Sequence, residues 1–450
     1  MFDLAINNGN ILDPLDGEYR GNIGIASGRI DKVSKEKLRG KKEINADGKK
    51  VSPGFIDIHI HEDPLDGDHI KYEVFNYMAL MGVTTALGGN CGIGNLDVSK
   101  YLDVIDRNGS PINYAGLVGI AEAREEVGCK DRYKPATKEE IKKIIDTVAV
   151  QLDKGALGIS FGLEYAPGTS TEEIIQICHE VRKFPNKLVS CHYRFDALRS
   201  LEALAEMIIV ARETKVKFQV SHIGSCAAFG QIEPALNMLN AAFDGGVDVM
   251  ADVYPYSAFC SFVGSAVFDP GCFERWRTSY DAIMATEGKY KGQRCDKEMF
   301  DYLRENEPDT LVVAFVMNEE EVVEAIKHPL TMIASDAIMH DRQGHPRAAG
   351  CFPRVLGRYV RQREDISLIK AIDKMTNMPA QRIGLKTKGR IKEGFDADIT
   401  IFDYDKIIDN ATFESPSEPP SGIDCVIVNG IEVVENGQLT GQHPGIGIRI

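Results

Sequence analysis

The sequence lacks long apolar runs and paired cysteines, and both absences narrow the class of protein. Among its 450 residues there is no uninterrupted apolar stretch of about 18 residues and no basic, apolar leader after Met1, so we expect neither a membrane span nor a secretory signal. The ten cysteines include no Cys-x-x-Cys pair, which is typical of reduced thiols in a reducing compartment. We therefore expect a cytoplasmic protein.

Positive charge is also scarce. The chain carries 52 Lys and Arg against 67 Asp and Glu, a net charge of -15, and the excess is scattered along the sequence. Nucleic-acid binding requires a basic face, so we expect no nucleic-acid partner. A hydrophobic content of 43% is that of a soluble globular protein. The expected partner is a small-molecule substrate rather than nucleic acid or a membrane, and a homo-oligomer is left open.

The two ends of the chain share one texture, and the middle has another. Short alternating runs separated by Asn-Gly and Ser-Gly turns occupy residues 1–52 and return at 390–450, which is typical of β-hairpins. Neither end is long enough to bury a core alone, so we expect both to pair into one small β-sandwich. The middle of the chain, residues 53–389, then forms a second domain, which we expect to be a barrel.

The middle alternates strand-like and helix-like segments, the pattern of βαβ units and a parallel sheet. Eight strand candidates lie at residues 55–61, 84–89, 113–118, 155–160, 188–192, 218–222, 247–253 and 331–336. Eight such repeats predict an α/β fold, a (β/α)8 TIM barrel. Residues 258–317 exceed a minimal barrel, and this insertion is expected either to act as a lid or a substrate wall or to be a packing excursion without a function of its own.

Chemically competent side chains stand at the carboxyl ends of these strands. In parallel α/β barrels the active site is built at this edge, and residues two apart on a strand point to one side. His59 and His61 can therefore converge on one metal ion. Four other strand ends contribute further donors, so that the full set is His59, His61, Cys91, His192, His222 and Asp336.

The donor types indicate the metal and the reaction. Imidazole, thiolate and carboxylate suit Zn²⁺ better than Mg²⁺ or Ca²⁺, which prefer oxygen ligands. A metal site with an open position lowers the pKa of bound water to about 7 and yields hydroxide at neutral pH. A nearby carboxylate then acts as general base and acid during attack on a carbonyl, and Asp336 is our candidate. We expect one or two Zn²⁺ ions per subunit.

Several phrases extend this pattern into a family resemblance. The HxH pair, the later single histidines, the last-strand Asp and the phrase GFDADITIFD at 394–403 resemble the amidohydrolase superfamily. More narrowly, GNCG at 89–92, GALGIS at 155–160, DVYPY at 252–256 and HPRAAGCFPRVLGR at 345–358 resemble the D-aminoacylase (N-acyl-D-amino-acid deacylase) family. The resemblance implies a zinc-dependent hydrolase of the amide bond of N-acyl-D-amino acids.

The resemblance also implies roles for single residues. His59, His61 and Asp336 correspond to a loosely occupied metal position, whereas Cys91, His192 and His222 correspond to a tight one. Many amidohydrolases bridge two metals with a carboxylated Lys on the fourth strand, but this strand has none, and Cys91 is its natural substitute. Arg347 matches the position that binds the substrate α-carboxylate, with Tyr254 and Tyr165 as hydroxyl partners. The chain departs from the family at Gly224, where a Lys is common.

Two alternatives stay open at this stage. The first keeps the metal site but changes the substrate, as in a cyclic amidohydrolase of the dihydroorotase or hydantoinase kind, or in a purine deaminase. Cys91 and the HPR phrase count against it. The second is a non-catalytic barrel that serves as a binding or assembly partner, and the presence of all six ligand candidates counts against that.

Overall fold

The computed structural model describes residues 1–450, and the middle of the chain is organised around an eight-stranded parallel sheet. Its strands are almost wholly buried, which is expected when helices cover the outer face of a barrel. In spatial order they are β6 (Phe55–Asp57), β9 (Val83–Gly88), β10 (Asn113–Gly119), β11 (Gly158–Gly162), β12 (Leu188–His192), β13 (Lys217–Val220), β14 (Val249–Val253) and β18 (Thr331–Ile333). The predicted TIM-barrel class is confirmed.

The sheet closes between its first and last strands. The backbone N–H of His61 donates to the Ala337 carbonyl at 2.9 Å, and that of Asp336 donates to the His59 carbonyl at 2.8 Å. Asp57 is buried beneath this seam and accepts from the backbone N–H groups of His59 and Ser335, each at 3.1 Å to Oδ1. The closure therefore places the two ends of the sheet, with their candidate ligands, side by side.

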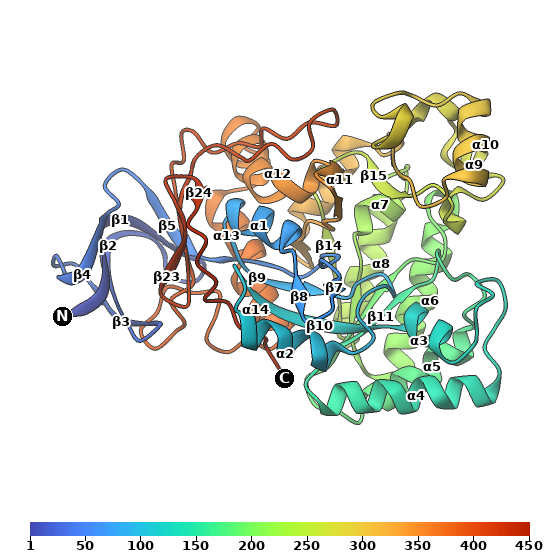
Figure 1. The fold of residues 1–450 in the computed structure, drawn as a ribbon, viewed down its shortest axis with the longest axis horizontal. Coiled ribbons are helices and arrows are strands. Elements are labelled where there is room, and N and C mark those ends of the chain that lie inside the picture. The colour runs from blue at the N-terminus through green and yellow to red at the C-terminus, as the bar shows by residue number, and fades with distance from the viewer.

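Helices cover the outside of the barrel (Figure 1). Most show the expected amphipathic pattern, with an apolar stripe turned toward the strands. In the sequence, Thr137 and Thr171 stand in capping-box positions, three residues before Glu140 and Ile174, and only the first is a full match. Helix α4 does begin with the capping box of Thr137 and Glu140, whereas α5 is capped by Ser170, one residue before Thr171. The main helices are α1 (Glu73–Leu80), α2 (Val98–Asn108), α3 (Ile120–Glu126), α4 (Lys138–Asp153), α5 (Thr171–Val181), α6 (Ser200–Thr214), α7 (Ile223–Ala227), α8 (Ile232–Asp244), α11 (Glu319–Lys327), α12 (Arg347–Arg354), α13 (Leu368–Met375) and α14 (Asn377–Arg382). None has the length and apolarity that a bilayer crossing requires.

Both ends of the chain build one β unit, as predicted, and its strands lie beside one another at one end of the molecule (Figure 1). They form a single nine-stranded mixed sheet in which β5 pairs antiparallel with β21, so that the N-terminal and C-terminal parts meet. This β unit has a separate apolar core of 14 buried residues. The strands are β1 (Phe2–Asp13), β2 (Gly17–Ala26), β3 (Arg29–Ser34), β4 (Gly40–Asn45), β5 (Lys50–Pro53), β21 (Ile399–Phe402), β22 (Ile423–Val428), β23 (Ile431–Glu435) and β24 (Gln438–Leu439).

The segment 258–317 forms a small unit over the mouth of the barrel, in yellow in Figure 1. Strands β15 (Phe259–Phe262), β17 (Leu311–Ala314) and β16 (Ile283–Ala285) make an antiparallel sheet, flanked by α9 (Cys272–Trp276) and α10 (Lys297–Asn306). Residues of β15 and β17 line the cavity beside the site described next. We refer to residues 258–317 as the insertion.

Candidate metal centre

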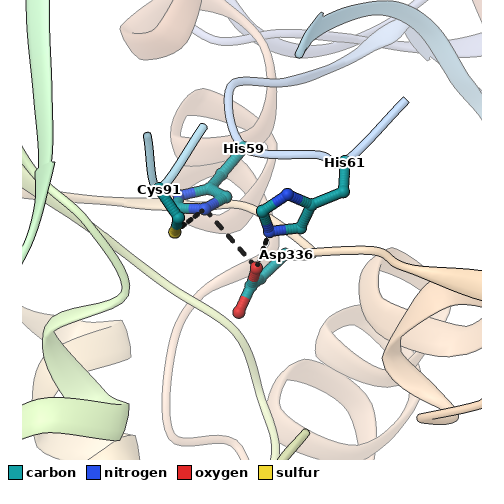
Figure 2. Close-up of side chains that lie close together, drawn as sticks. All are labelled: His59, His61, Cys91 and Asp336. Carbon is teal, nitrogen blue, oxygen red and sulfur yellow. Dashed lines mark hydrogen bonds and ion pairs between the residues drawn. The ribbon is translucent and has the colours of Figure 1, made fainter. Parts of the chain in front are cut away.

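The six side chains proposed as ligands meet at the carboxyl edge of the barrel. Their donor atoms form two groups, each with all donors within 4.8 Å of one another, and Cys91 belongs to both. The first group is His59, His61, Cys91 and Asp336, whose side chains converge in Figure 2. The second is Cys91, His192 and His222. The structure thus offers two adjoining metal-binding groups that share a thiol.

The first group is compact. His61 Nε2 lies 3.1 Å and His59 Nε2 lies 3.4 Å from Asp336 Oδ1, while Cys91 Sγ lies 3.3 Å from His59 Nε2. His59 and Cys91 are fully buried, and His61 is the most exposed member, with 17% of its side chain accessible. A donor set of two imidazoles, a carboxylate and a thiol fits a borderline ion such as Zn²⁺.

In the second group, Cys91 Sγ lies 3.4 Å from His222 Nε2. His192 Nδ1 is buried and has no hydrogen-bond partner, whereas its Nε2 lies 3.0 Å from Glu164 Oε2. A buried imidazole nitrogen without a partner is costly in an apolar site, but it is expected of a metal ligand. The orphaned nitrogen therefore supports the assignment of His192 to a cation.

The chain adopts unusual backbone conformations to present these ligands. Cys91, His222 and Asp336 have φ values of 55°, 32° and 53°, in the left-handed region that residues other than glycine rarely enter. Such conformations cost on the order of 1–3 kcal/mol each and cluster at functional sites. Gly89 has a φ of 75°, and a Cβ there would overlap the Leu117 carbonyl, so the turn before Cys91 requires glycine.

Residues beyond the predicted set hold the ligands in place. Asp252 Oδ1 lies 3.2 Å from His59 Nδ1 and accepts from the His222 backbone N–H at 2.8 Å. Ser225 Oγ lies 2.7 Å from His222 Nδ1. Glu62 accepts from the Gly89 N–H at 2.6 Å and so fixes the turn before Cys91. Sequence analysis missed these contacts, although Asp252 stands near a strand end and Glu62 directly follows the HxH pair.

Burial and charged neighbours shift the pKa values of three candidate ligands. Burial raises the pKa of the Cys91 thiol well above its usual range, and the Asp336 and Asp252 carboxylates add to the effect. Burial also lowers the pKa of His222 well below its usual value, with His192 acting in the same direction. Burial by itself raises the pKa of Asp336, but Arg347, His59 and His222 together hold that pKa well below its usual range. Asp336 is therefore ionised at neutral pH.

The three predicted substrate residues stand beside the ligands. Arg347, at the start of α12, is buried, and its Nη2 lies 2.9 Å from Asp336 Oδ2. Its guanidinium lies 4.6 Å from the centre of the Tyr254 ring, and the Tyr254 hydroxyl is buried without a partner. Tyr165 packs against His192 with ring centres 4.6 Å apart. A cavity of about 270 Å³ is lined by Arg347, Tyr165, His61 and Asp336.

The chain is also similar to known proteins. Residues 292–434 match a model of the amidohydrolase family. The chain is 30% identical to a D-aminoacylase of Alcaligenes xylosoxydans xylosoxydans, over 99% of this chain and 97% of that protein. It is also 30% identical to an N-acyl-D-glutamate deacylase of the same organism, over 96% of this chain and 93% of that protein.

Solved structures give the same result. A crystal structure of D-aminoacylase superposes with a TM-score of 0.89 at 30% identity, covering 100% of both chains. The N-acyl-D-glutamate deacylase of Bordetella bronchiseptica, solved with zinc and a phosphonate inhibitor, also has a TM-score of 0.89 at 30% identity, and again both chains are covered to 100%. An L-hydantoinase of Arthrobacter aurescens, at 16% identity and a TM-score of 0.67, shares the fold alone.

A parallel barrel with this donor cluster at its carboxyl edge, together with these matches, defines a metal-dependent amidohydrolase. Within that class the chain belongs to the N-acyl-D-amino-acid deacylase family, the family of D-aminoacylase.

Proposed function

We propose that the protein hydrolyses N-acyl-D-amino acids to a carboxylate and a free D-amino acid, with Zn²⁺ as its cofactor. The observation that carries the proposal is the state of Arg347. Its side chain is 2% exposed, and its Nε and Nη1 are buried without hydrogen-bond partners. A buried cation with unused donors next to the metal ligands is suited to bind an anion, and a guanidinium binds a carboxylate through two parallel hydrogen bonds. The α-carboxylate of an acylated amino acid fits this requirement.

The residues divide the work of hydrolysis as follows. His59, His61 and Asp336, or Cys91, His192 and His222, would hold Zn²⁺, which when bound would supply a Lewis acid for the amide carbonyl and would lower the pKa of water. Asp336 takes a proton from the attacking water and passes it to the leaving nitrogen as the C–N bond breaks. Arg347 holds the carboxylate two bonds from that nitrogen. Tyr165 or Tyr254 donates its hydroxyl to the developing negative charge on oxygen.

The cavity also favours one kind of amino-acid side chain. Arg347 is its only Lys or Arg, and much of the remaining wall is apolar, with Phe262, Leu311, Ile338 and Met339 among the lining residues. Gly224, where the family often has Lys, faces Val253, Met317 and Val322 and adds no cation. A second carboxylate would be desolvated here without a partner, which is costly. We therefore propose substrates with apolar side chains, and not D-glutamate or D-aspartate derivatives.

A substrate panel tests the activity and this preference together. Metal-replete protein is incubated with N-acetyl and N-formyl derivatives of D-Leu, D-Met, D-Phe, D-Glu and D-Asp and of L-Leu, and free amine is measured. We expect kcat/KM for the apolar D-substrates to exceed that for the acidic ones at least about 100-fold, equivalent to ~2.7 kcal/mol. Release of amine from none of them would refute the proposed activity, and equal rates would refute the side-chain preference.

A substitution in the cavity wall should change this preference. Phe262→Arg places a second cation on β15, so we expect the ratio of rates on N-acetyl-D-Glu and N-acetyl-D-Leu to rise at least about tenfold, because the buried carboxylate gains a partner. Phe262→Leu is the matched control and should leave N-acetyl-D-Glu a poor substrate. An unchanged ratio of rates in Phe262→Arg would indicate that the side chain of the substrate binds outside this cavity.

Zinc binding should depend on pH through Cys91. Because the pKa of the buried thiol is raised, metal-free protein carries the protonated thiol between pH 6 and 8, and the thiolate forms only on binding. Each bound ion at this donor releases a proton, so apparent affinity should rise up to about tenfold per pH unit. Competition with a chelator measures the slope. Cys91→Ala should flatten it, whereas Cys178→Ala, at a buried thiol in α5, should not. A steep slope in Cys91→Ala would remove Cys91 from the ligand set.

A further inference from the structure

A line of charged side chains joins the metal ligand His192 to the insertion. Glu164 Oε2 lies 3.0 Å from His192 Nε2, and its other oxygen lies 3.3 Å from Arg275 Nη2. Arg275 Nε lies 2.5 Å from Asp196 Oδ1, and Asp196 Oδ2 accepts from Trp276 Nε1 at 2.6 Å. We call Glu164, Arg275 and Asp196 the carboxylate bridge.

The members of the carboxylate bridge come from three different parts of the fold. Glu164 follows β11 and Asp196 follows β12, whereas Arg275 belongs to α9 of the insertion. Glu164 and Asp196 are buried, and Arg275 is also tied to the insertion by a hydrogen bond from Nη2 to the Val267 carbonyl at 2.8 Å. Arg275 lies between two buried carboxyl groups, which places the arginine where it can fix Glu164, while burial and the nearby Glu164 raise the pKa of Asp196 to about 8.

The contacts of the two ring nitrogens in His59 and His222, compared with those in His192, indicate what the carboxylate bridge does. His59 and His222 present Nε2 to Cys91, while their Nδ1 atoms face Asp252 and Ser225. His192 is reversed, because its Nε2 faces Glu164, whereas its Nδ1 is buried with neither a hydrogen-bond partner nor the carboxylate contact that His59 Nδ1 has. A neutral imidazole has one N–H and one lone pair, so donation from Nε2 to Glu164 leaves the lone pair on Nδ1.

We propose that Glu164 is a positioning residue for metal binding, which selects the tautomer and ring orientation of His192 so that Nδ1 faces the cation with Cys91 and His222. Arg275, itself held by Asp196, keeps Glu164 in that place. The insertion therefore contributes to metal retention as well as to the cavity wall. This inference rests on the metal centre of the proposed function and goes beyond it, since it assigns roles to residues outside the ligand set.

Zinc affinity of purified, folded variants tests the proposal without reference to amide hydrolysis. Glu164→Ala should weaken Zn²⁺ binding about 10–100-fold in chelator competition, the range found when a carboxylate behind a histidine ligand is removed. Glu164→Gln keeps an acceptor for His192 and should lose less. The matched control is Glu206→Ala, because Glu206 pairs with Arg194 close to the end of β12 but contacts no metal ligand. Affinity unchanged in Glu164→Ala would overturn the proposal.

Two further measurements separate positioning from a general loss of stability. In ¹⁵N spectra of the metal-free protein, with His192 assigned by its absence from a His192→Gln sample, the proton should reside on Nε2 and should redistribute in Glu164→Ala. A proton on Nδ1 in the parent protein would overturn the proposal.

Variants of Arg275 test the role of the insertion. Arg275→Met should weaken Zn²⁺ binding by less than Glu164→Ala, and Arg275→Lys should restore part of the loss. Equal affinity in Arg275→Met and the parent would show that the insertion does not contribute to metal retention. If the bridge variants lose zinc while no amide is cleaved, this inference stands and the proposed activity fails.

Discussion

Asp336→Asn is expected to reduce kcat for N-acetyl-D-Leu by about 10²–10⁴-fold, the usual contribution of general acid-base catalysis. The amide has the same shape as the carboxylate but cannot accept and return a proton. Asp336 is suited to the role because its Oδ1 faces His59 and His61 and its pKa is held low, so it begins the reaction ionised. Steady-state kinetics with metal-replete protein measure the change.

Metal analysis must accompany those kinetics, because Asp336 is also a member of the first metal group. We expect Asp336→Asn to retain the ion bound by Cys91, His192 and His222, since none of these ligands is altered. Asp301→Asn, at an exposed carboxylate paired with Lys297, is the control and should have full activity. Turnover within tenfold of the parent in a metal-loaded Asp336→Asn sample would reject Asp336 as the base.

Arg347→Met is expected to raise KM for N-acyl-D-amino acids steeply, with a loss of about 2–5 kcal/mol in substrate binding, as when one partner of a buried charge pair is truncated. Methionine is close to the arginine stem in size but offers no donors. The guanidinium is also a cause of the low pKa of Asp336, so its loss should raise that pKa. We therefore expect the acid limb of the kcat/KM profile to move to higher pH.

A substrate without a carboxylate provides the control for Arg347. An N-acetyl alkylamine has nothing for the guanidinium to bind, so the parent and Arg347→Met should have similar KM values for it. Arg358→Met removes an arginine of the same sequence phrase that pairs with Glu319 instead, and it should leave KM for N-acetyl-D-Leu unchanged. An unchanged KM for N-acetyl-D-Leu in Arg347→Met would remove Arg347 from the binding site.

Much of the centre could be anticipated because strand periodicity is local. His192 stands four residues after Leu188 on β12, so both point into the barrel, and the parallel arrangement puts every strand end at one edge. The same reasoning brought Cys91, His222 and Asp336 to that edge, and the structure gathers their donor atoms. Their roles as ligands, and those of Arg347, Tyr165 and Tyr254 toward substrate, stay predictions.

Other features could not be read from local pattern. Thr171 was predicted as a helix cap, but the neighbouring Ser170 takes that position, since a one-residue shift leaves the apolar pattern of α5 almost unchanged. Glu164 and Arg275 lie 111 residues apart, and nothing in either neighbourhood indicates that they meet. The apolar wall of the cavity combines β15 and β17 of the insertion with residues after β6 and β18, so its character depends on how distant segments pack.

By itself the sequence determined the parallel barrel, the β unit shared by the two ends, and the residue types available at the strand ends, because backbone periodicity and turn chemistry act over a few residues. Only the tertiary structure decided that the Cys91 thiol lies close to both groups of candidate ligands, that Arg347 is buried with donors to spare, and that Nε2 of His192 faces Glu164. Those properties arise from contacts between segments far apart in the chain, where closure of the barrel and burial set distances, tautomers and pKa values.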